Sequence, residues 1–204
     1  MKRGLFNKEW IEETALQIKH IIEPRSVAIV GATDITGKVG GAITRNALSS
    51  EYPGKVYLIN PKRNIIFDRK AYSSIKDIDE KVDLVELIIP AEQVPEVVGE
   101  AAKKGVKGAV VVSAGFAEVG NRKLQDELVR VGKETGVRIV GPNCFGIINT
   151  EIDLDLTFTF TRALKGSIAF VSQSGAMCCG VLDRALQQEI GFSKFFNLGN
   201  KCDV

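Results

Sequence analysis

The chain has 204 residues, and its 27 Lys and Arg residues against 25 Asp and Glu residues leave a formal net charge of +2. Hydrophobic residues make up 45% and charged residues 25%, a balance that is typical of a globular protein and excludes a disordered one. Because the charges nearly cancel, we expect neither a nucleic-acid-binding nor a membrane-binding surface. A length between one and two average domains predicts a sizeable buried core.

Histidine and cysteine usage excludes further classes of site. His20 is the single histidine, so no site in this chain can use two imidazoles. The cysteines are Cys144, Cys178, Cys179 and Cys202. They form no C-x-x-C pair and lack the spacing of a zinc site. The start of the chain is too charged for an export signal, and no apolar run approaches the ~18 residues of a membrane span. We therefore expect reduced thiols and a cytoplasmic protein.

The predicted elements begin with a helix over 7–22, which Pro24 ends, so residues 1–24 form a helical extension. Short runs rich in Val and Ile then alternate with helical patterns. The predicted strands are 26–30, 55–59, 84–89, 109–112 and 138–140, and the predicted helices are 39–48, 94–104 and 123–135. This alternation predicts an α/β fold with a Rossmann-like, doubly wound parallel sheet over residues 25–147. The segment 69–72 receives no assignment.

A second unit follows a change of pattern after Gly146. Residues 152–160 alternate between apolar and polar side chains, which indicates an extended crossing segment within 148–165. A strand over 166–171, a helix over 176–188 and a strand over 194–198 come next. Two strands and one helix are too few for an independent sheet domain, so we expect the unit over 166–204 to be incomplete.

The loop after the first strand, residues 31–41, is rich in glycine and leads into a helix. Glycines allow close approach of the backbone to a ligand, and a helix N-terminus offers free N–H groups to an anion. The stretch from Gly31 to Gly37 is one residue too long for a P-loop, and Val39 replaces the Ser or Thr that would hold Mg²⁺. The strict G-x-G-x-x-G pattern is also absent. We expect an anion-binding loop, with a plain turn as the alternative.

The end of the second strand carries two cations instead of the Asp or Glu that usually binds the ribose of NAD. Lys62 and Arg63 follow Asn60-Pro61 at this point. Two cations suit a phosphate, either the 2′-phosphate of NADP or the 3′-phosphate of coenzyme A. The alternative is an ordinary solvated pair of basic residues.

The remaining strand ends present small or apolar residues. Pro90 offers a flat apolar surface for an adenine ring, and Ser113 and Ala114 are small enough to admit a ligand near the backbone. After the fifth strand, Pro142 fixes the entry to a loop that presents Asn143 and Cys144. A buried cysteine is commonly structural, so a reactive Cys144 is the less favoured alternative.

A second turn of the same kind joins the strand over 166–171 to the following helix. Ser172, Ser174 and Gly175 place two hydroxyls and several N–H groups at a positive helix end, which suits an anion. N-capping of the helix alone is the alternative. The G-x-S-x-G pattern is absent and no second histidine exists, so a serine hydrolase is not expected.

Taken together, these loops resemble the ADP-forming acyl-CoA synthetases, relatives of the succinyl-CoA synthetase α subunit. The matching segments, from about residue 23 to the end of the chain, are 30–33, 60–62, 90–91, 113–120, 141–146 and 171–176. The Gly-Pro-Asn-Cys and Ser-Gln-Ser-Gly segments, with their spacing, are the specific ones. The resemblance implies a CoA-binding Rossmann-like domain over 25–147, followed over 166–204 by the start of a flavodoxin-like domain of the succinyl-CoA synthetase type.

The same resemblance implies roles for individual residues. The implied CoA-binding residues are Gly31, Thr33, Asp34, Ile35, Thr36, Gly37, Lys62, Arg63, Pro90, Ser113, Ala114, Asn143 and Cys144. Among them, Lys62 and Arg63 would contact the phosphates of CoA, and Asn143 and Cys144 would lie near its thiol. Ser172, Ser174 and Gly175 would cradle the phosphate of a phosphohistidine.

In that family, cleavage of an acyl-CoA is coupled to phosphorylation of ADP through an acyl phosphate and a phosphohistidine. The resemblance implies an ATP-grasp partner that holds ADP or ATP with Mg²⁺, hence a hetero-oligomer that also needs the rest of the flavodoxin-like domain. The family histidine would lie beyond Val204, and His20 precedes the first strand, so we expect no catalytic residue and no activity in this chain alone.

Two features of the sequence limit the resemblance or leave alternatives. Succinate-type relatives carry a tyrosine shortly after the Ser-x-Ser-Gly turn, where this chain has Cys178-Cys179, so succinate is not the expected substrate. A stand-alone CoA-binding or regulatory module without chemistry is the main alternative. An NADP-dependent oxidoreductase is the other, because of the basic residues after the second strand.

Overall fold

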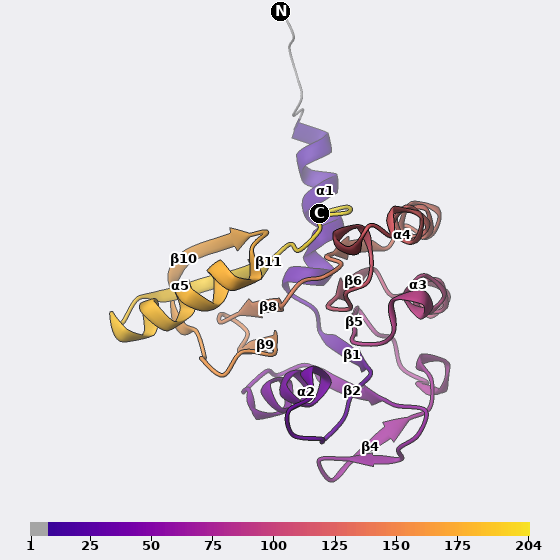
Figure 1. The fold of residues 1–204 in the computed structure, drawn as a ribbon, viewed down its shortest axis with the longest axis horizontal. Coiled ribbons are helices and arrows are strands. Elements are labelled where there is room, and N and C mark those ends of the chain that lie inside the picture. The colour runs from indigo at the N-terminus through magenta and orange to yellow at the C-terminus, as the bar shows by residue number, and fades with distance from the viewer. Residues whose placement is uncertain (1–7) are drawn as a thin grey trace, which may run out of the picture.

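The computed structural model describes residues 8–204, which form two sheets with five α-helices packed around them (Figure 1). The first sheet and its helices comprise α1 (Lys8–Ile22), β1 (Ser26–Val30), α2 (Val39–Ser49), β2 (Lys55–Ile59), β3 (Ile65–Ile66), β4 (Arg69–Tyr72), β5 (Leu84–Leu87), α3 (Val94–Lys103), β6 (Gly108–Val111), α4 (Arg122–Thr135) and β7 (Arg138–Val140). The second comprises β8 (Gly146–Asn149), β9 (Leu154–Thr157), β10 (Leu164–Ser172), α5 (Gly175–Gln187) and β11 (Gly191–Asn197). The expected helix over 7–22 is α1, except that Asn7 lies outside the described residues.

The first sheet has the order β3-β4-β2-β1-β5-β6-β7 and is parallel except for the β3–β4 pair. The central strand β1 pairs with β2 on one side and β5 on the other, which confirms the doubly wound parallel sheet. All residues of β1, β5 and β6 are buried, as their Val-rich sequences predict for strands covered on both faces. Helices α3 and α4 cover one face, while α1, α2 and the β8–β9 hairpin cover the other.

The segment 69–72, unassigned from the sequence, is strand β4, which pairs in parallel with β2 and forms a hairpin with β3. The hairpin turn consists of Phe67 and Asp68, whose φ angles are +48° and +58°. Tight hairpin turns of this geometry usually carry Asn-Gly or Asp-Gly. Phe-Asp gives no such signal, which explains why the hairpin is not visible in the sequence.

The second sheet has the order β10-β11-β8-β9, with β10 and β11 parallel and the other pairs antiparallel. It therefore has two more strands than the sequence pattern provides. The alternating segment within 148–165 includes β9, and β8 begins at Gly146. Leu154 and Leu156 of β9 are fully buried in the core that α2 shares with the first sheet. The β8–β9 hairpin thus lies between the two units.

The last residues of the chain lie beside β7, the outer strand of the first sheet. The backbone N–H groups of Asn200, Cys202 and Val204 donate to the carbonyls of Pro142, Gly141 and Ile139. The Arg138 guanidinium also pairs with Asp203, with Nε 2.9 Å from the carboxylate. This return brings the end of β11 against the loop that follows β7.

Candidate functional site

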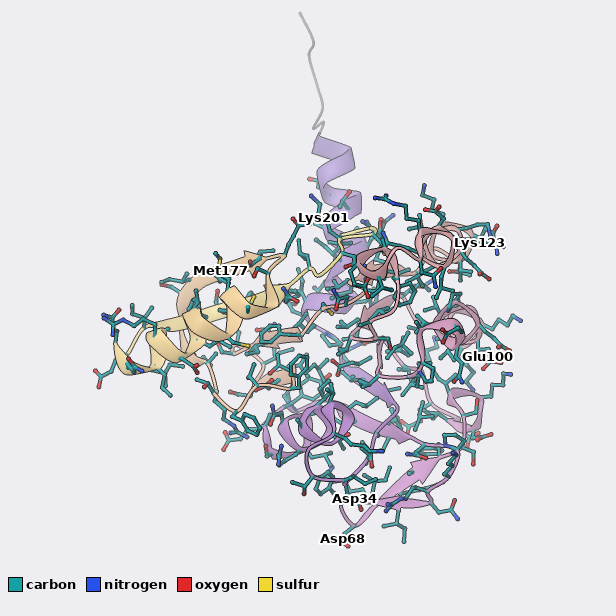
Figure 2. The ribbon with its side chains drawn as sticks, viewed as in Figure 1. Asp34, Asp68, Glu100, Lys123, Met177 and Lys201 are labelled. Atoms are coloured by element: carbon teal, nitrogen blue, oxygen red, sulfur yellow. The ribbon has the colours of Figure 1, made fainter. Side chains whose placement is uncertain are left out.

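A pocket of about 460 Å³ opens at the carboxyl ends of β1, β2 and β5. It is lined by Gly31, Thr33, Ile35, Lys38, Val39, Gly40, Asn60, Lys62, Arg63 and Ile88. Ligands of doubly wound sheets bind at this edge, beside the strand where the order reverses. Figure 2 shows Asp34 on the loop after β1, at the same end of the molecule as Asp68 at the tip of the hairpin.

Glycine is required at two positions of this pocket. Gly31 has a φ of +96°, and a Cβ there would lie 2.2 Å from the carbonyl oxygen of Ile88. A Cβ on Gly40 would lie 2.5 Å from the carbonyl oxygen of Gly31. The first turn of α2 is therefore packed directly against the end of β1, which brings the helix N-terminus to the pocket.

The N-terminus of α2 has the properties of an anion site. Lys38 precedes the helix and its side chain caps none of the free N–H groups, and the first turn contains no acidic residue. Lys38 itself lines the pocket, together with Val39. The positive end of the helix and a lysine thus face the same space. Sequence reasoning missed Lys38, although the predicted helix begins at residue 39, as α2 does.

The cations after β2 also line the pocket, but one of them is paired. Arg63 Nη1 lies 3.1 Å from Asp34 Oδ1, while the ammonium group of Lys62 is exposed. Asn60 shapes this corner: its Nδ2 donates to the carbonyl of Ala32 at 2.8 Å, and its Oδ1 accepts from the N–H of Lys62 at 2.8 Å. The side chain of Asn60 therefore ties the end of β2 to the glycine-rich loop.

The remaining candidate residues of the first loop differ in burial and in whether they line the pocket. Thr33 is buried, and its Oγ1 accepts a hydrogen bond from the N–H of Ile35 at 3.3 Å, so it orders the loop. Ile35 and Val39 expose 40% and 42% of their apolar side chains at the pocket. Thr36 and Gly37 are exposed and do not line it.

None of the candidates after the other strands lines this pocket. Pro90 and Ala114 are exposed, which leaves both open to a ligand. The Ser113 side chain is buried and donates to the carbonyl of Ile89 at 2.6 Å, while accepting from the N–H of the same residue at 3.1 Å. Ser113 therefore joins the ends of β5 and β6, and its hydroxyl is occupied.

The loop after β7 presents Asn143 and buries Cys144. Asn143 is exposed with a φ of +56°, and its Nδ2 lies 3.4 Å from Oδ1 of Asn200. The Cys144 thiol donates to the carbonyl of Val111 at 3.2 Å, and burial raises its pKa to about 12. A thiol with so high a pKa is not a nucleophile at neutral pH, so the geometry gives Cys144 a structural role in this loop.

The Ser-Gln-Ser-Gly turn lies at the end of the second sheet, outside the pocket. Ser174 caps α5, since its Oγ accepts from the N–H of Met177 at 3.2 Å, and the Ser172 Oγ accepts from the N–H of Ser174 at 3.1 Å. Gly175 begins the helix, whose first turn carries no acidic residue. Figure 2 shows Met177 at this end of α5. Ser174 therefore caps the helix, and the positive end of α5 carries no acidic residue that would repel an anion.

One buried acid lies behind the pocket. Glu86 is on β5, two residues before the pocket residue Ile88, and neither of its carboxyl oxygens has a hydrogen-bond partner. Burial raises the pKa of Glu86 well above 4.5, and the charge of Asp155 adds to this effect. Burial also raises the pKa of Asp155, to about 6. Burial without a hydrogen-bond partner therefore favours the protonated, uncharged form of Glu86.

Residues 8–204 contain neither a membrane-spanning helix nor a group of metal ligands. No helix there is long and apolar enough to cross a membrane, and no three potential ligands among His, Cys, Asp and Glu are grouped to hold a metal ion. His20 lies on α1, where its Nδ1 is 3.9 Å from Asp83 Oδ1 at the opposite end of β5 from the pocket.

Comparison with known proteins identifies the family. Residues 25–150 match the family model described as CoA binding domain. The chain belongs to this family of CoA-binding domains. Residues 165–204 match a second model, described as succinyl-CoA ligase like flavodoxin domain. Together with the relatives described next, these two matches confirm the resemblance to the ADP-forming acyl-CoA synthetases from about residue 23 onward.

Relatives of known activity share both parts of this CoA-binding chain. It is 46% identical over 188 residues to the acetate–CoA ligase [ADP-forming] of Methanocaldococcus jannaschii, covering 92% of this chain and 26% of the relative. It is 40% identical over 189 residues to the α subunit of acetate–CoA ligase [ADP-forming] II of Pyrococcus furiosus, covering 92% of this chain and 41% of the subunit. The chain thus spans between about a quarter and two fifths of the length of these relatives.

A solved structure shows the same fold. The acetyl-coenzyme A synthetase 1 of Ca. Korarchaeum cryptofilum, in complex with phosphate and ADP, matches with a TM-score of 0.88 and 38% identity, over 92% of this chain and 40% of that one. This match confirms the Rossmann-like architecture of the CoA-binding domain.

Proposed function

We propose that this chain is the CoA-binding portion of an ADP-forming acyl-CoA synthetase of the acetate type. The observation that carries the proposal is the pocket after β1 and β2, which combines a helix N-terminus with three cations inside a CoA-binding domain. CoA carries an adenosine 3′-phosphate and a diphosphate, and both are anions that Lys38, Lys62 and Arg63 would attract.

The residues of the pocket fit CoA in chemistry as well as charge. The first turn of α2, which no side chain caps, would offer backbone N–H groups to a phosphate, while the apolar side chains of Ile35 and Val39 suit the adenine ring. Pro90 and Ala114 continue an exposed path along the strand ends. When bound, CoA supplies the thiol that carries the acyl group, and Asn143 would lie near it.

In the proposed reaction, acyl-CoA, ADP and phosphate give the free acid, CoA and ATP. The Ser-Gln-Ser-Gly turn before α5 would serve the phosphoryl-transfer part of this reaction. Ser172, Ser174 and Gly175 would hold a phosphate at the positive end of α5. The phosphohistidine would come from outside residues 1–204, and ADP or ATP with Mg²⁺ from an ATP-grasp partner in a cytoplasmic hetero-oligomer. The edge strand β10, with Ile168 and Val171 about half exposed, would pair with the rest of the flavodoxin-like domain.

Calorimetric titration of this chain with CoA and with dephospho-CoA tests the proposal. We expect Lys62→Ala to weaken CoA about tenfold, since one charge-assisted contact contributes about 1.4 kcal/mol. The same substitution should barely change the affinity for dephospho-CoA. Lys123→Ala, on the exposed surface of α4, is the matched control (Figure 2). Failure of the wild-type chain to bind CoA would contradict the proposal.

A second measurement separates a ligase from a CoA-binding module without chemistry. Mixing this chain with the missing part of the flavodoxin-like domain and an ATP-grasp partner should give acyl-CoA-dependent formation of ATP. CoA binding without any such activity would favour the stand-alone module.

A further inference from the structure

We propose that Asn197 is a positioning residue whose side-chain amide fixes the loop after β7 and the turn before α5 relative to each other. The inference rests on the proposed function, which places the thiol of CoA near the first of these segments and a phosphate at the second. Asn197 is the last residue of β11, and its side chain is 1% exposed. It touches neither ligand in this assignment.

The amide of Asn197 contacts three segments at once. Its Oδ1 accepts a hydrogen bond from the N–H of Phe145 at 2.8 Å, in the loop that carries Asn143 and Cys144. Its Nδ2 donates to the carbonyl of Ser172 at 2.9 Å and lies 3.7 Å from the Sγ of Cys178 in the first turn of α5. One planar amide therefore holds the loop after β7 through its acceptor and the turn between β10 and α5 through its donor.

The turn before α5 lies directly against this amide. A Cβ built on Gly175 would lie 3.9 Å from the Oδ1 of Asn197, so the first residue of the helix is in contact range. The carbonyl of Ser172 also accepts from the N–H of Leu198 at 2.8 Å. The position of the free N–H groups at the start of α5 thus depends on where Asn197 holds the end of β10.

The residues that follow Asn197 extend the same arrangement to the loop after β6. Asn200 Nδ2 donates to a carboxylate oxygen of Glu118, whose other oxygen accepts from the N–H groups of Gly115 and Phe116. Burial opposes ionisation of Glu118, but these hydrogen bonds outweigh it and lower its pKa. Asn200 Oδ1 faces Asn143. The segment after β11 therefore contacts both the loop after β6 and the loop after β7.

Only a neutral amide satisfies both neighbours of Asn197. In Asn197→Asp the acceptor toward Phe145 remains, but a carboxylate oxygen replaces the donor and faces the carbonyl of Ser172. Two acceptors in contact repel each other, and a buried group loses its partner. We expect the Ser172 turn to move away from the loop after β7, while the pocket after β1, which shares no residue with this network, is unchanged.

The matched control is Asn149→Asp. Asn149 is also fully buried, on β8 of the same sheet, and its amide likewise donates to one carbonyl, of Ile22, and accepts from one N–H, of Glu151. Both variants should lose thermal stability. Asn197→Ala, which introduces no carboxylate, tests the same role if Asn197→Asp fails to fold.

The experiment is a titration of ¹⁵N-labelled chain with inorganic phosphate, followed at the amides of Gly175 and Met177, together with CoA calorimetry. We expect Asn197→Asp and Asn197→Ala to raise the apparent Kd for phosphate about tenfold or more, with CoA affinity unchanged. Asn149→Asp should leave both affinities unchanged. Equal phosphate affinity in the Asn197 variants and the wild type would overturn the inference, as would an equal loss in the Asn149 control.

The two proposals fail in different ways. A wild-type chain that binds no CoA contradicts the proposed function itself. A wild-type chain that binds CoA and phosphate, with no effect of Asn197, contradicts only the positioning role. A wild-type chain that binds CoA, while its α5 amides never respond to phosphate, refutes both the phosphate turn and the role of Asn197.

Discussion

Replacement of the buried acid behind the pocket should change how stability depends on pH. Because burial raises the pKa of Glu86 in the folded chain, the folded state keeps its proton while the unfolded state releases it near the ordinary value of 4.5. Stability is therefore greatest below that value and is lost as the pH rises toward the folded pKa. The loss is about 1.4 kcal/mol for each pH unit over which only the unfolded chain is ionised.

Glu86→Gln removes this titration and keeps the size of the side chain. We would measure the free energy of unfolding of both proteins in urea between roughly pH 5 and pH 7. The variant should become more stable relative to the wild type by about 1.4 kcal/mol per pH unit, as long as Glu86 stays protonated in the folded wild type. Asp155 titrates in both proteins, so its contribution cancels. Glu127→Gln, on the exposed side of α4, controls for the substitution itself. A constant difference across this range would refute the assignment of Glu86 as a neutral buried acid.

Three further substitutions or reagents test local features. Gly40→Ala should destabilise the chain by about 2 kcal/mol in urea unfolding, because the new Cβ would lie 2.5 Å from a carbonyl oxygen. Gly180→Ala, in open space on α5, should stabilise the chain slightly, and equal effects of the two substitutions would contradict this reasoning. Ser174→Ala should cost about 1 kcal/mol through loss of the α5 cap, measured in the same way, and an unchanged midpoint would argue against capping. A thiol reagent should label the partly exposed Cys179 long before Cys144, and early labelling of Cys144 would show that its burial is incomplete.

The sequence predicts the central sheet well, because its signal is local. Runs of Val and Ile with no charged interruption indicate strands buried on both faces, and β1 and β6 are such runs. Glu86 interrupts β5, yet the strand forms, since the neighbouring strands supply its backbone partners on both sides. The second sheet was harder, because β8 pairs with β11, which lies more than 40 residues later in the chain, and β9 joins the sheet only through β8.

The sequence predicts where the candidate site lies better than it predicts which residues line it. Gly31, Lys62 and Arg63 line the pocket because residues after parallel strands meet at one edge. Ser113 follows the same rule, but its hydroxyl is occupied by backbone groups. Asn197 carries no visible signal, since a sequence does not distinguish a buried asparagine that joins two segments from an exposed one that ends a strand.

The exposed edge of β10 affects how the chain will behave in isolation. An edge strand with unpaired N–H and C=O groups and half-exposed Ile168 and Val171 is a template for pairing with another chain. Where no other strand covers this edge, two copies can pair through the same strand. Preparations of this chain should therefore self-associate as concentration rises, and a charged substitution such as Val171→Lys should suppress that association without touching the CoA-binding domain.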